Sequence, residues 1–181
     1  DYQLVLNPDV ELASDALANA IRWLDAHPEV GAAAPAVARP DGTPVYLCKR
    51  YPTVFDLFLR GFAPRRVRRW FRKRLECYEM RDAIDTAGVT PVFDPPVMSG
   101  CCMLVRRKAI DATGGFDPKF FLYFEDFDWS VRLNKVTKTA YLPSFRAVHH
   151  GGDAAKKGWK HIGWFVNSGF RFYNKHGWRF V

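Results

Sequence analysis

Three carboxylates stand within four positions of the stretch FLYFEDFDWSVRLNK, which covers residues 121–135. Glu125, Asp126 and Asp128 follow directly after an aromatic run, at the expected start of a helix. Acids there can accept hydrogen bonds from the free N–H groups of the first turn and interact well with the helix dipole. The three positions project in different directions, so at least one acid must leave that capping role. An aromatic wall that removes water from it would raise its pKa toward that of a useful general base.

A second set of reactive side chains stands at the ends of two expected strands. Asp9 follows the first apolar stretch in a turn that contains Asn7 and Pro8, and His149 and His150 end a later strand. A carboxylate at the carboxyl end of a strand lies where α/β sheets bind ligands. An aspartate and a histidine that face one cleft could hold Mg²⁺ or Mn²⁺ and leave positions for phosphate oxygens. The alternatives are a solvated loop aspartate and a structural histidine pair.

The hydrophobic pattern predicts a mixed α/β fold to position these residues. The expected strands are residues 4–6, two strands joined by a turn at Asp41 and Gly42 within residues 30–47, and residues 95–107, 139–143 and 146–150. The expected helices run from Ser14 as N-cap to His27, from Pro64 to Leu75, through residues 108–113 to a stop at Gly114, over residues 125–134, and from residue 159 to a stop at Gly177. The helix after Pro64 is expected to be amphipathic, with Val67, Trp70, Phe71 and Leu75 on one face.

Length and composition indicate one globular domain, since the chain has 181 residues and 48% of them are apolar. No stretch approaches the roughly 18 uninterrupted apolar residues of a membrane-spanning helix, and no secretory leader pattern is present, so a cytoplasmic protein is expected. The four cysteines form no CxxC pair, which predicts reduced thiols rather than a zinc site.

The net charge of +8 comes from one segment. Residues 60–75 contain eight basic residues and no acidic one, whereas basic and acidic residues are equal in number in the rest of the chain. Bases interleaved with Trp70 and Phe71 suit an anionic membrane surface, and they would also suit nucleic acid. Nucleic acid is not expected, because no recognised binding fold accompanies the charge. A non-catalytic membrane-surface or polyanion-binding module, and a plain solvated helix, remain as alternatives.

Three stretches, LVLNPDVEL, MSGCCMLVRRKAIDATGGFDPKFFLYFEDFDWSVRL and AYLPSFRAVHHGG, occur in an order and spacing that resembles the inverting glycosyltransferases of family 2. The similarity is strongest to the bacterial rhamnosyltransferase-like branch, which builds cell-surface polysaccharides. This resemblance implies a GT-A fold, a nucleotide-sugar donor, a glycan or lipid-linked acceptor and a divalent metal, Mn²⁺ or Mg²⁺. Rhamnose is the commonest sugar of that branch, and the enzyme would work at the inner face of the membrane.

The resemblance also assigns roles to residues. Asp9 stands at the family's DxD-type motif and would meet the metal and the donor diphosphate, while Asn7 takes the place of that motif's first acid. Asp126 would be the general base, and Glu125 completes the family's acid pair. His149 matches the histidine that joins the metal in some relatives.

A second group of positions is expected to contact the sugar substrates. Ser99 and Gly100, and Gly115 and Asp117, would line the pocket, because small residues let a sugar approach the backbone. Asp128 would cap the helix or hydrogen-bond the acceptor.

In this family an N-terminal half made of βα units holds the nucleotide and precedes the DxD-type turn. Residues 1–181 are therefore expected to form a single partial GT-A domain, a C-terminal fragment that is inactive alone and binds donor weakly. The sheet should end in an unpaired edge, which predicts association with another chain, such as a homodimer.

Overall fold

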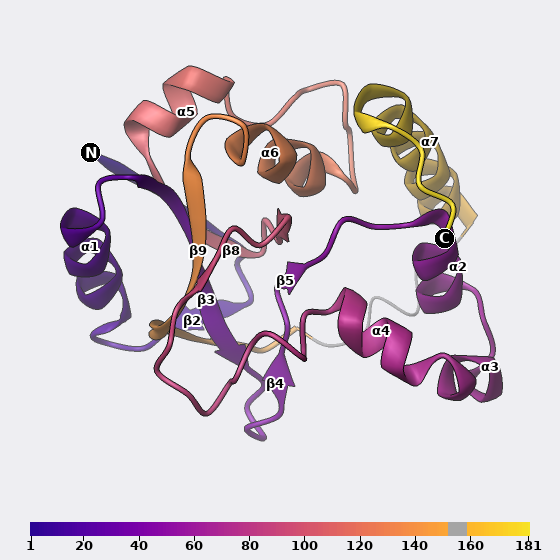
Figure 1. Cartoon of the computed structure of the whole chain (residues 1–181), viewed down its shortest axis with the longest axis horizontal. Helices are drawn as coiled ribbons and strands as arrows, with labels where there is room; N and C mark the ends of the chain where they lie inside the picture. Colours follow the sequence, from indigo (N-terminus) through magenta and orange to yellow (C-terminus); the bar gives the residue numbers. More distant parts are fainter. Residues whose placement is uncertain (152–158) are drawn as a thin grey trace.

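A mixed sheet of seven strands forms the centre of the chain in the computed structural model, which describes residues 1–151 and 159–181 (Figure 1). Its main strand order is β1-β8-β3-β9-β2, with β4 paired to β3 and β6 paired to β9. The bounds are β1 Tyr2–Leu6, β2 Val10–Leu12, β3 Val30–Ala38, β4 Pro44–Val45, β6 Val92–Phe93, β8 Cys102–Arg106 and β9 Lys138–His149. The pair β3 and β9 is parallel and the other pairs are antiparallel, so the predicted mixed α/β class is confirmed. Within the described residues, β1 pairs only with β8 and forms one edge of the sheet.

A short second sheet divides the strand that was expected over residues 95–107. Here β7, Val97–Met98, pairs with β5, Cys48–Lys49, whereas β8 begins at Cys102 and pairs with β1 and β3. The single-strand prediction is wrong because the two halves of this stretch find partners in different sheets. The connecting residues 99–101 lie between the sheets, where their backbone groups are available to other parts of the chain.

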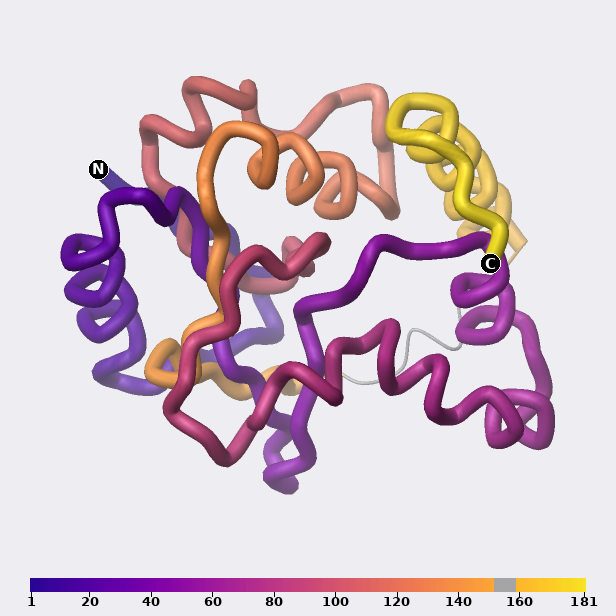
Figure 2. The backbone as a smooth tube through the Cα atoms, in the orientation of Figure 1, coloured from indigo at the N-terminus to yellow at the C-terminus, as the bar shows by residue number. Residues whose placement is uncertain are grey.

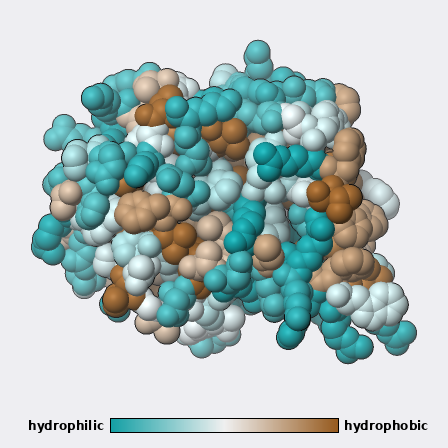
Figure 3. Space-filling view, in the orientation of Figure 1, coloured by the Kyte–Doolittle hydropathy of each residue, from teal (hydrophilic) through white to brown (hydrophobic). Residues whose placement is uncertain are grey.

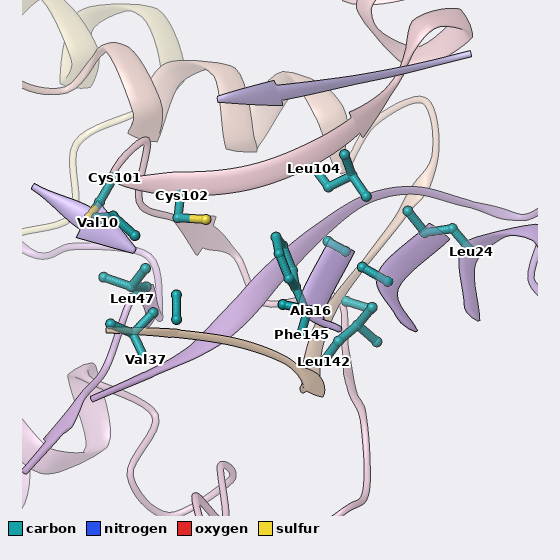
Figure 4. Close-up of a cluster of buried hydrophobic side chains, with 14 of the residues drawn as sticks. Val10, Ala16, Leu24, Val37, Leu47, Cys101, Cys102, Leu104, Leu142 and Phe145 are labelled. Atoms are coloured by element: carbon teal, nitrogen blue, oxygen red, sulfur yellow. The ribbon is translucent and has the colours of Figure 1, made fainter. Parts of the chain in front are cut away.

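One face of the large sheet is covered by α1, Ala16–Ala26. Its buried residues Ala16, Ala20 and Leu24 join Leu142 and Phe145 in a hydrophobic cluster, which Figure 4 shows. Small side chains on both elements let the helix lie close to the strands. The N-cap is Asp15 rather than the predicted Ser14, and it makes no side-chain capping bond.

The opposite face is covered by α5, Arg107–Thr113, and α6, Glu125–Leu133. Trp129 and Leu133 of α6 are buried against the sheet with Met103. The helix α5 ends as predicted at Gly114, which adopts a left-handed conformation with φ of 76°. The indole of Trp129 donates to the hydroxyl of Thr113 at 2.9 Å, so the two helices are joined directly.

The remaining helices lie beside the sheet rather than on it, and they are α2 Val54–Gly61, α3 Arg65–Trp70, α4 Arg72–Tyr78 and α7 Trp159–His176. The tube view shows α7 next to α2 (Figure 2), and the rings of Phe62 and Phe165 lie 6.5 Å apart there. A third apolar cluster, here called the aromatic cluster, joins this group to α6; it contains Phe120, Phe124, Phe172 and Tyr173. None of the helices in residues 1–151 and 159–181 has the length and apolar character needed to cross a bilayer.

The cationic segment is not the single amphipathic helix that was predicted. It breaks at Phe71 into α3 and α4, and Trp70 is 80% exposed instead of packed. Contacts with α2 account for the break: the Phe71 ring meets the edge of Phe55 at 5.2 Å, and Arg74 pairs with buried Asp56 at 2.5 Å.

Candidate active site

Asp126 lies on the first turn of α6 and is held by two backbone donors. Its Oδ2 accepts the N–H of Gly100 at 3.0 Å, and its Oδ1 accepts the N–H of Phe127 at 2.9 Å. Burial raises the pKa of this carboxyl, and the two backbone bonds and the charge of Lys49 oppose the shift. The direction agrees with the expectation for a general base.

Gly100 lets the chain approach this carboxylate closely. A Cβ at that position would lie 3.2 Å from the Cβ of Asp126 and 3.6 Å from the ring of Phe116. The first of these contacts is tighter than ordinary packing, so a larger residue would push Asp126 away from its N–H donor.

Glu125 directly precedes Asp126 and is partly buried. Its Oε2 is enclosed and has no hydrogen-bond partner in the described part of the chain. Burial, and then the charge of Asp126, raise the pKa of Glu125. Buried polar atoms are usually paired, so this oxygen lacks a partner that a water or a ligand hydroxyl could supply.

An unusual turn aims this acid pair. Tyr123 and Phe124 both have positive φ, 67° and 64°, which costs non-glycine residues of the order of 1–3 kcal/mol each. The carbonyl of Phe124 begins α6 by accepting the N–H of Asp128 at 2.8 Å. No sequence signal marks two aromatic residues for this conformation.

The helix α7 holds that turn in place. The Phe124 ring lies 5.1 Å from that of Phe165 and 5.4 Å from that of Phe172, and the hydroxyl of Ser168 donates to the carbonyl of Leu122 at 2.8 Å. A Cβ at Gly169 would be 3.2 Å from the Phe124 ring. The position of the acid pair therefore depends on a helix more than 30 residues later in the chain.

Asp9 and His149 meet as predicted at the ends of two strands. The pairing of β2 with β9 sets Val10 opposite His149, which brings His149 Nε2 to 3.3 Å from Asp9 Oδ2. His150 pairs instead with Glu11 at 2.9 Å and is exposed. A Cβ on Gly151 would be 1.9 Å from Asp9 Oδ2, so a larger residue there would displace the Asp9 carboxylate from its present position.

These two residues fit a divalent ion whose remaining ligands come from a substrate. No group of three or more His, Cys, Asp and Glu residues is arranged for metal binding within residues 1–151 and 159–181. Asp9 Oδ1 is enclosed, however, and lacks a partner among the described residues. Carboxylate, imidazole and phosphate oxygen together form an ordinary donor set for Mn²⁺ or Mg²⁺.

The connecting residues 99–101 join the two parts of the site. The N–H of Asn7 donates to the carbonyl of Cys101 at 2.9 Å, and Gly100 bonds Asp126 on the other side. Burial raises the pKa of the Cys101 thiol to about 11, and the charges of Asp9 and Asp126 both add to the shift. Both carboxylates therefore act on one thiol, which was not foreseen because Cys101 was taken as part of a continuous strand. Ser99 accepts the N–H of Cys101 at 3.3 Å and stabilises the same turn.

Asp128 does not face the site, so its predicted contact with substrate is wrong. Its carboxylate is fully buried and accepts from Arg132 at 2.8 Å, from Lys175 at 2.7 Å and from His176 at 2.7 Å. Gly115 and Asp117, which were predicted to line the pocket, belong to the same network. Arg132 also donates to the Gly115 carbonyl at 2.6 Å, and Lys175 donates to Asp117 at 2.8 Å. These contacts tie α6 to α7.

Lys49 was missed by sequence reasoning, because a lone lysine in a short strand carries no signal. Only 7% of it is exposed, and its ammonium donates to the carbonyl of Tyr46 at 2.7 Å. Burial lowers its pKa to about 8, and the charges of Arg60, Glu79 and Asp126 all act on it. Lys49 thus supplies a positive charge that lowers the pKa of Asp126.

No protein-family model matches the chain. The N-acetylglucosaminyl-diphospho-decaprenol L-rhamnosyltransferase of Mycobacterium tuberculosis is 34% identical over 160 residues, which cover 83% of this chain and 47% of that protein. Rhamnosyltransferase WbbL of Escherichia coli K12 is 23% identical over 182 aligned residues, 95% of this chain and 61% of that protein. The chain therefore spans about half the length of the first of these curated relatives.

A solved structure is similar in fold. The crystal structure of GalNAc-T7 with UDP, GalNAc and Mn²⁺ has a TM-score of 0.59 and 15% identity, and the likeness covers 96% of this chain and 31% of that one. That protein is a GT-A glycosyltransferase, so the predicted fold is confirmed.

Proposed function

We propose that this chain, a homologue of rhamnosyltransferases with a GT-A fold, carries the catalytic base and acceptor side of a glycosyltransferase. The donor is a nucleotide-diphosphate sugar, with rhamnose favoured by the relatives. The acceptor is a sugar joined to a polyprenol lipid through a diphosphate, the class of compound in the name of the Mycobacterium tuberculosis relative. The product would enter a cell-surface polysaccharide.

The observation that carries this proposal is the setting of Asp126. Its two oxygens are fixed by the N–H groups of Gly100 and Phe127, and each keeps a lone pair for a further donor. An acceptor hydroxyl can donate there, and Asp126 removes its proton as the oxygen attacks the anomeric carbon. A single displacement of this kind inverts that carbon and needs no second carboxylate.

The donor diphosphate is proposed to lie at Asp9 and His149. A divalent ion held by these residues would neutralise the charge that grows on the departing diphosphate. Gly151 leaves room for oxygen atoms beside Asp9, and residues 99–101 keep this side of the site in register with the base. Ser99 and Gly100 would then border the reacting sugar.

The proposed activity belongs to a protein that has both halves of such a domain, and residues 1–181 form the base-side half. Residues 60–75 would hold it at an anionic membrane surface, the inner face of the membrane, where lipid-linked acceptors lie. A purely non-catalytic module is not favoured, because the curated relatives are transferases. A homodimer through the β1 edge also stays a proposal.

Replacement of the base tests this function. In the enzyme assayed with thymidine-diphosphate rhamnose and a lipid-diphosphate-linked N-acetylglucosamine, Asp126→Asn should lower kcat by a factor of about 10² or more, because the amide cannot accept the proton. Donor affinity should change little, and Asp111→Asn, an exposed aspartate on α5, should behave as the unmodified protein. Near-normal turnover of Asp126→Asn would show that the base has been assigned wrongly.

A further inference from the structure

Between α2, α3 and α4 lies a hollow of about 500 Å³ that is lined mainly by arginines, here called the arginine hollow. Its lining residues are Arg60, Arg65, Arg68, Arg69, Arg72, Leu75, Glu76, Glu79 and Arg81. Six guanidinium groups face two carboxylates, so the hollow has an excess of positive charge. Planar guanidinium groups bind phosphate oxygens through pairs of parallel hydrogen bonds.

The two glutamates leave half of the arginines without a counter-ion. Glu79 pairs with Arg81 at 2.6 Å and more loosely with Arg60 at 3.8 Å, and Glu76 lies 3.6 Å from Arg72. The other three arginines have no acidic partner in the part of the chain that the structure describes; they are Arg65, Arg68 and Arg69. These three come from one helix, α3, and are available to an anion.

The arginine hollow adjoins buried Tyr78, which ends α4 directly before Glu79, and the Lys49 ammonium lies 5.9 Å from the Tyr78 ring. Arg60 and Glu79 line the hollow, and the charges of both act on buried Lys49, together with the charge of Asp126. Tyr78, also buried, is acted on by Arg60 and Asp126 in the same way.

Apolar side chains stand next to this cationic surface. Leu75 lines the hollow, Phe62 is 48% exposed at the end of α2, and Trp70 is 80% exposed directly after Arg69. In the space-filling view hydrophilic side chains crowd over α4, and a hydrophobic group lies beside them over α2 (Figure 3). The surface thus combines anion-binding groups with rings that suit an apolar chain.

We propose that the arginine hollow binds the diphosphate of a prenyl-diphosphate-linked acceptor, with Phe62 and Trp70 against the first prenyl units. The inference rests on the proposed function for the role of the bound lipid, and it names the part of the chain that recognises that substrate. A nucleoside diphosphate could stack its base on the same exposed rings, so thymidine diphosphate is the competing ligand in the titration that follows. The acceptor sugar, attached to the other end of the diphosphate, would extend past Tyr78 and Lys49 toward Asp126.

A binding measurement that needs no catalysis tests this proposal. The 181-residue chain is titrated with geranyl diphosphate, inorganic pyrophosphate and thymidine diphosphate by calorimetry. Geranyl diphosphate should bind at least about tenfold more tightly than the other two, because its prenyl chain buries more apolar surface than a nucleoside does and pyrophosphate buries none. Trp70→Ser should weaken geranyl diphosphate binding and leave pyrophosphate binding unchanged. Equal affinity for thymidine diphosphate would assign the hollow to the donor and overturn the proposal.

A matched pair of double variants separates a built site from general attraction. Arg65→Gln with Arg69→Gln removes two lining charges, and Arg66→Gln with Lys73→Gln removes two charges of the same segment that do not line the hollow. The first pair should weaken geranyl diphosphate binding about tenfold or more, and the second should have little effect. Equal losses would show that the segment attracts anions only through its overall charge, which contradicts the proposal. Circular dichroism and thermal unfolding check that both variants fold.

Kinetics distinguish a failure of this inference from a failure of the proposed function. In the active enzyme the lining variant should raise KM for the lipid-linked acceptor about tenfold while kcat changes little. Asp126→Asn should still bind geranyl diphosphate normally. If Asp126→Asn stays active but the lining variant loses binding, the assignment of the base is wrong and the proposed lipid-diphosphate site is supported. If KM and binding are unchanged in the lining variant, only the proposed lipid-diphosphate site is refuted.

Discussion

At the scale of single residues, the ionisation of Asp126 is set by opposing effects. Burial raises its pKa, whereas two N–H donors and the ammonium of Lys49 favour the charged form. As the proposed general base, Asp126 works only when it is deprotonated, so activity should rise with pH through a pKa above the ordinary aspartate value of 3.8. The same raised pKa makes the folded state lose some stability as the pH rises through that window, because the folded state then holds the proton more tightly than the unfolded state.

Removal of the Lys49 charge should move this acid limb. Lys49→Met deletes an ammonium that lowers the pKa of Asp126, so log kcat plotted against pH should show its acid limb at a higher pH than in the unmodified enzyme. Lys108→Met on α5, outside the site, is the control and should leave the profile in place. An acid limb at the same pH in Lys49→Met would show that the charge of Lys49 does not affect the pKa of Asp126.

Asp128 gives a prediction about stability rather than chemistry. Its pKa is lowered by hydrogen bonds to Lys175, His176 and Arg132, although burial opposes them. Asp128→Asn should reduce the free energy of unfolding at pH 7 by about 3–5 kcal/mol, because Arg132 and Lys175 would lose the buried carboxylate that they both contact. A urea titration measures this loss. The contribution of Asp128 is present above about pH 4 and should disappear as the pH falls through its lowered pKa, a loss that the variant should not show.

Asp111 provides the control for that experiment. It also pairs with an arginine four positions away on a helix, Arg107 at 3.1 Å, but both side chains are more than 60% exposed, 63% and 67%. Asp111→Asn should change the free energy of unfolding by less than about 1 kcal/mol. Similar losses in both variants would contradict the view that burial gives Asp128 its effect.

At the scale of elements, α7 positions the strained turn that starts α6. Gly169 and Gly163 lie on this one helix, but a Cβ on Gly169 would be 3.2 Å from the Phe124 ring, whereas a Cβ on Gly163 would meet nothing within 4 Å. Gly163→Ala should therefore stabilise the fold by about 1 kcal/mol through helix propensity. Gly169→Ala should not stabilise the fold, because its Cβ would press on the Phe124 ring. It should also lower turnover, because a shift of Phe124 would move the acid pair. Urea unfolding compares the two variants; equal stabilisation would show that Phe124 has room to move.

Element boundaries show where sequence reasoning succeeded and where it stopped. The helix at Glu125 was predicted because acids at its first turn and an apolar period followed each other, and the ends at Gly114 and Gly177 were predicted because glycine accepts positive φ. The break at Phe71 was not predicted. It depends on contacts with α2, which the pattern of residues around Phe71 does not indicate.

The candidate site divides in the same way. The pairing of Asp9 with His149 was foreseen, because both residues stand at strand ends. The burial of Asp128 was not, because Lys175 and His176 come from a helix about 50 residues later. Partners of that kind are invisible to reasoning from nearby positions, as are the positive φ angles of Tyr123 and Phe124.

At the scale of the whole molecule, charge and apolar surface are unevenly distributed. The eight bases between residues 60 and 74 account for the net charge of +8, and they lie on α2, α3 and α4 at one side of the sheet. The exposed rings Phe58, Phe62 and Trp70 come from the same helices. One side of the protein is therefore suited to an anionic, partly apolar surface, and this is the side that holds the arginine hollow.

The aromatic cluster is separate from the two apolar clusters that pack against the sheet. The helix α6 contributes Trp129 and Leu133 to one of the sheet clusters and Phe127 and Val131 to the aromatic cluster. A molecule built in this way can open in parts, because the smaller body can separate without loss of the larger. Backbone amides of α7 should then exchange with deuterium sooner than those of β3 and β9, at a free energy below that of global unfolding. Each such opening would release the turn at Tyr123 and Phe124, so the fraction of time in which Asp126 is correctly aimed is set by the closing equilibrium of α7. Amide exchange read by mass spectrometry would reject this if α7 and β3 exchanged at the same rate.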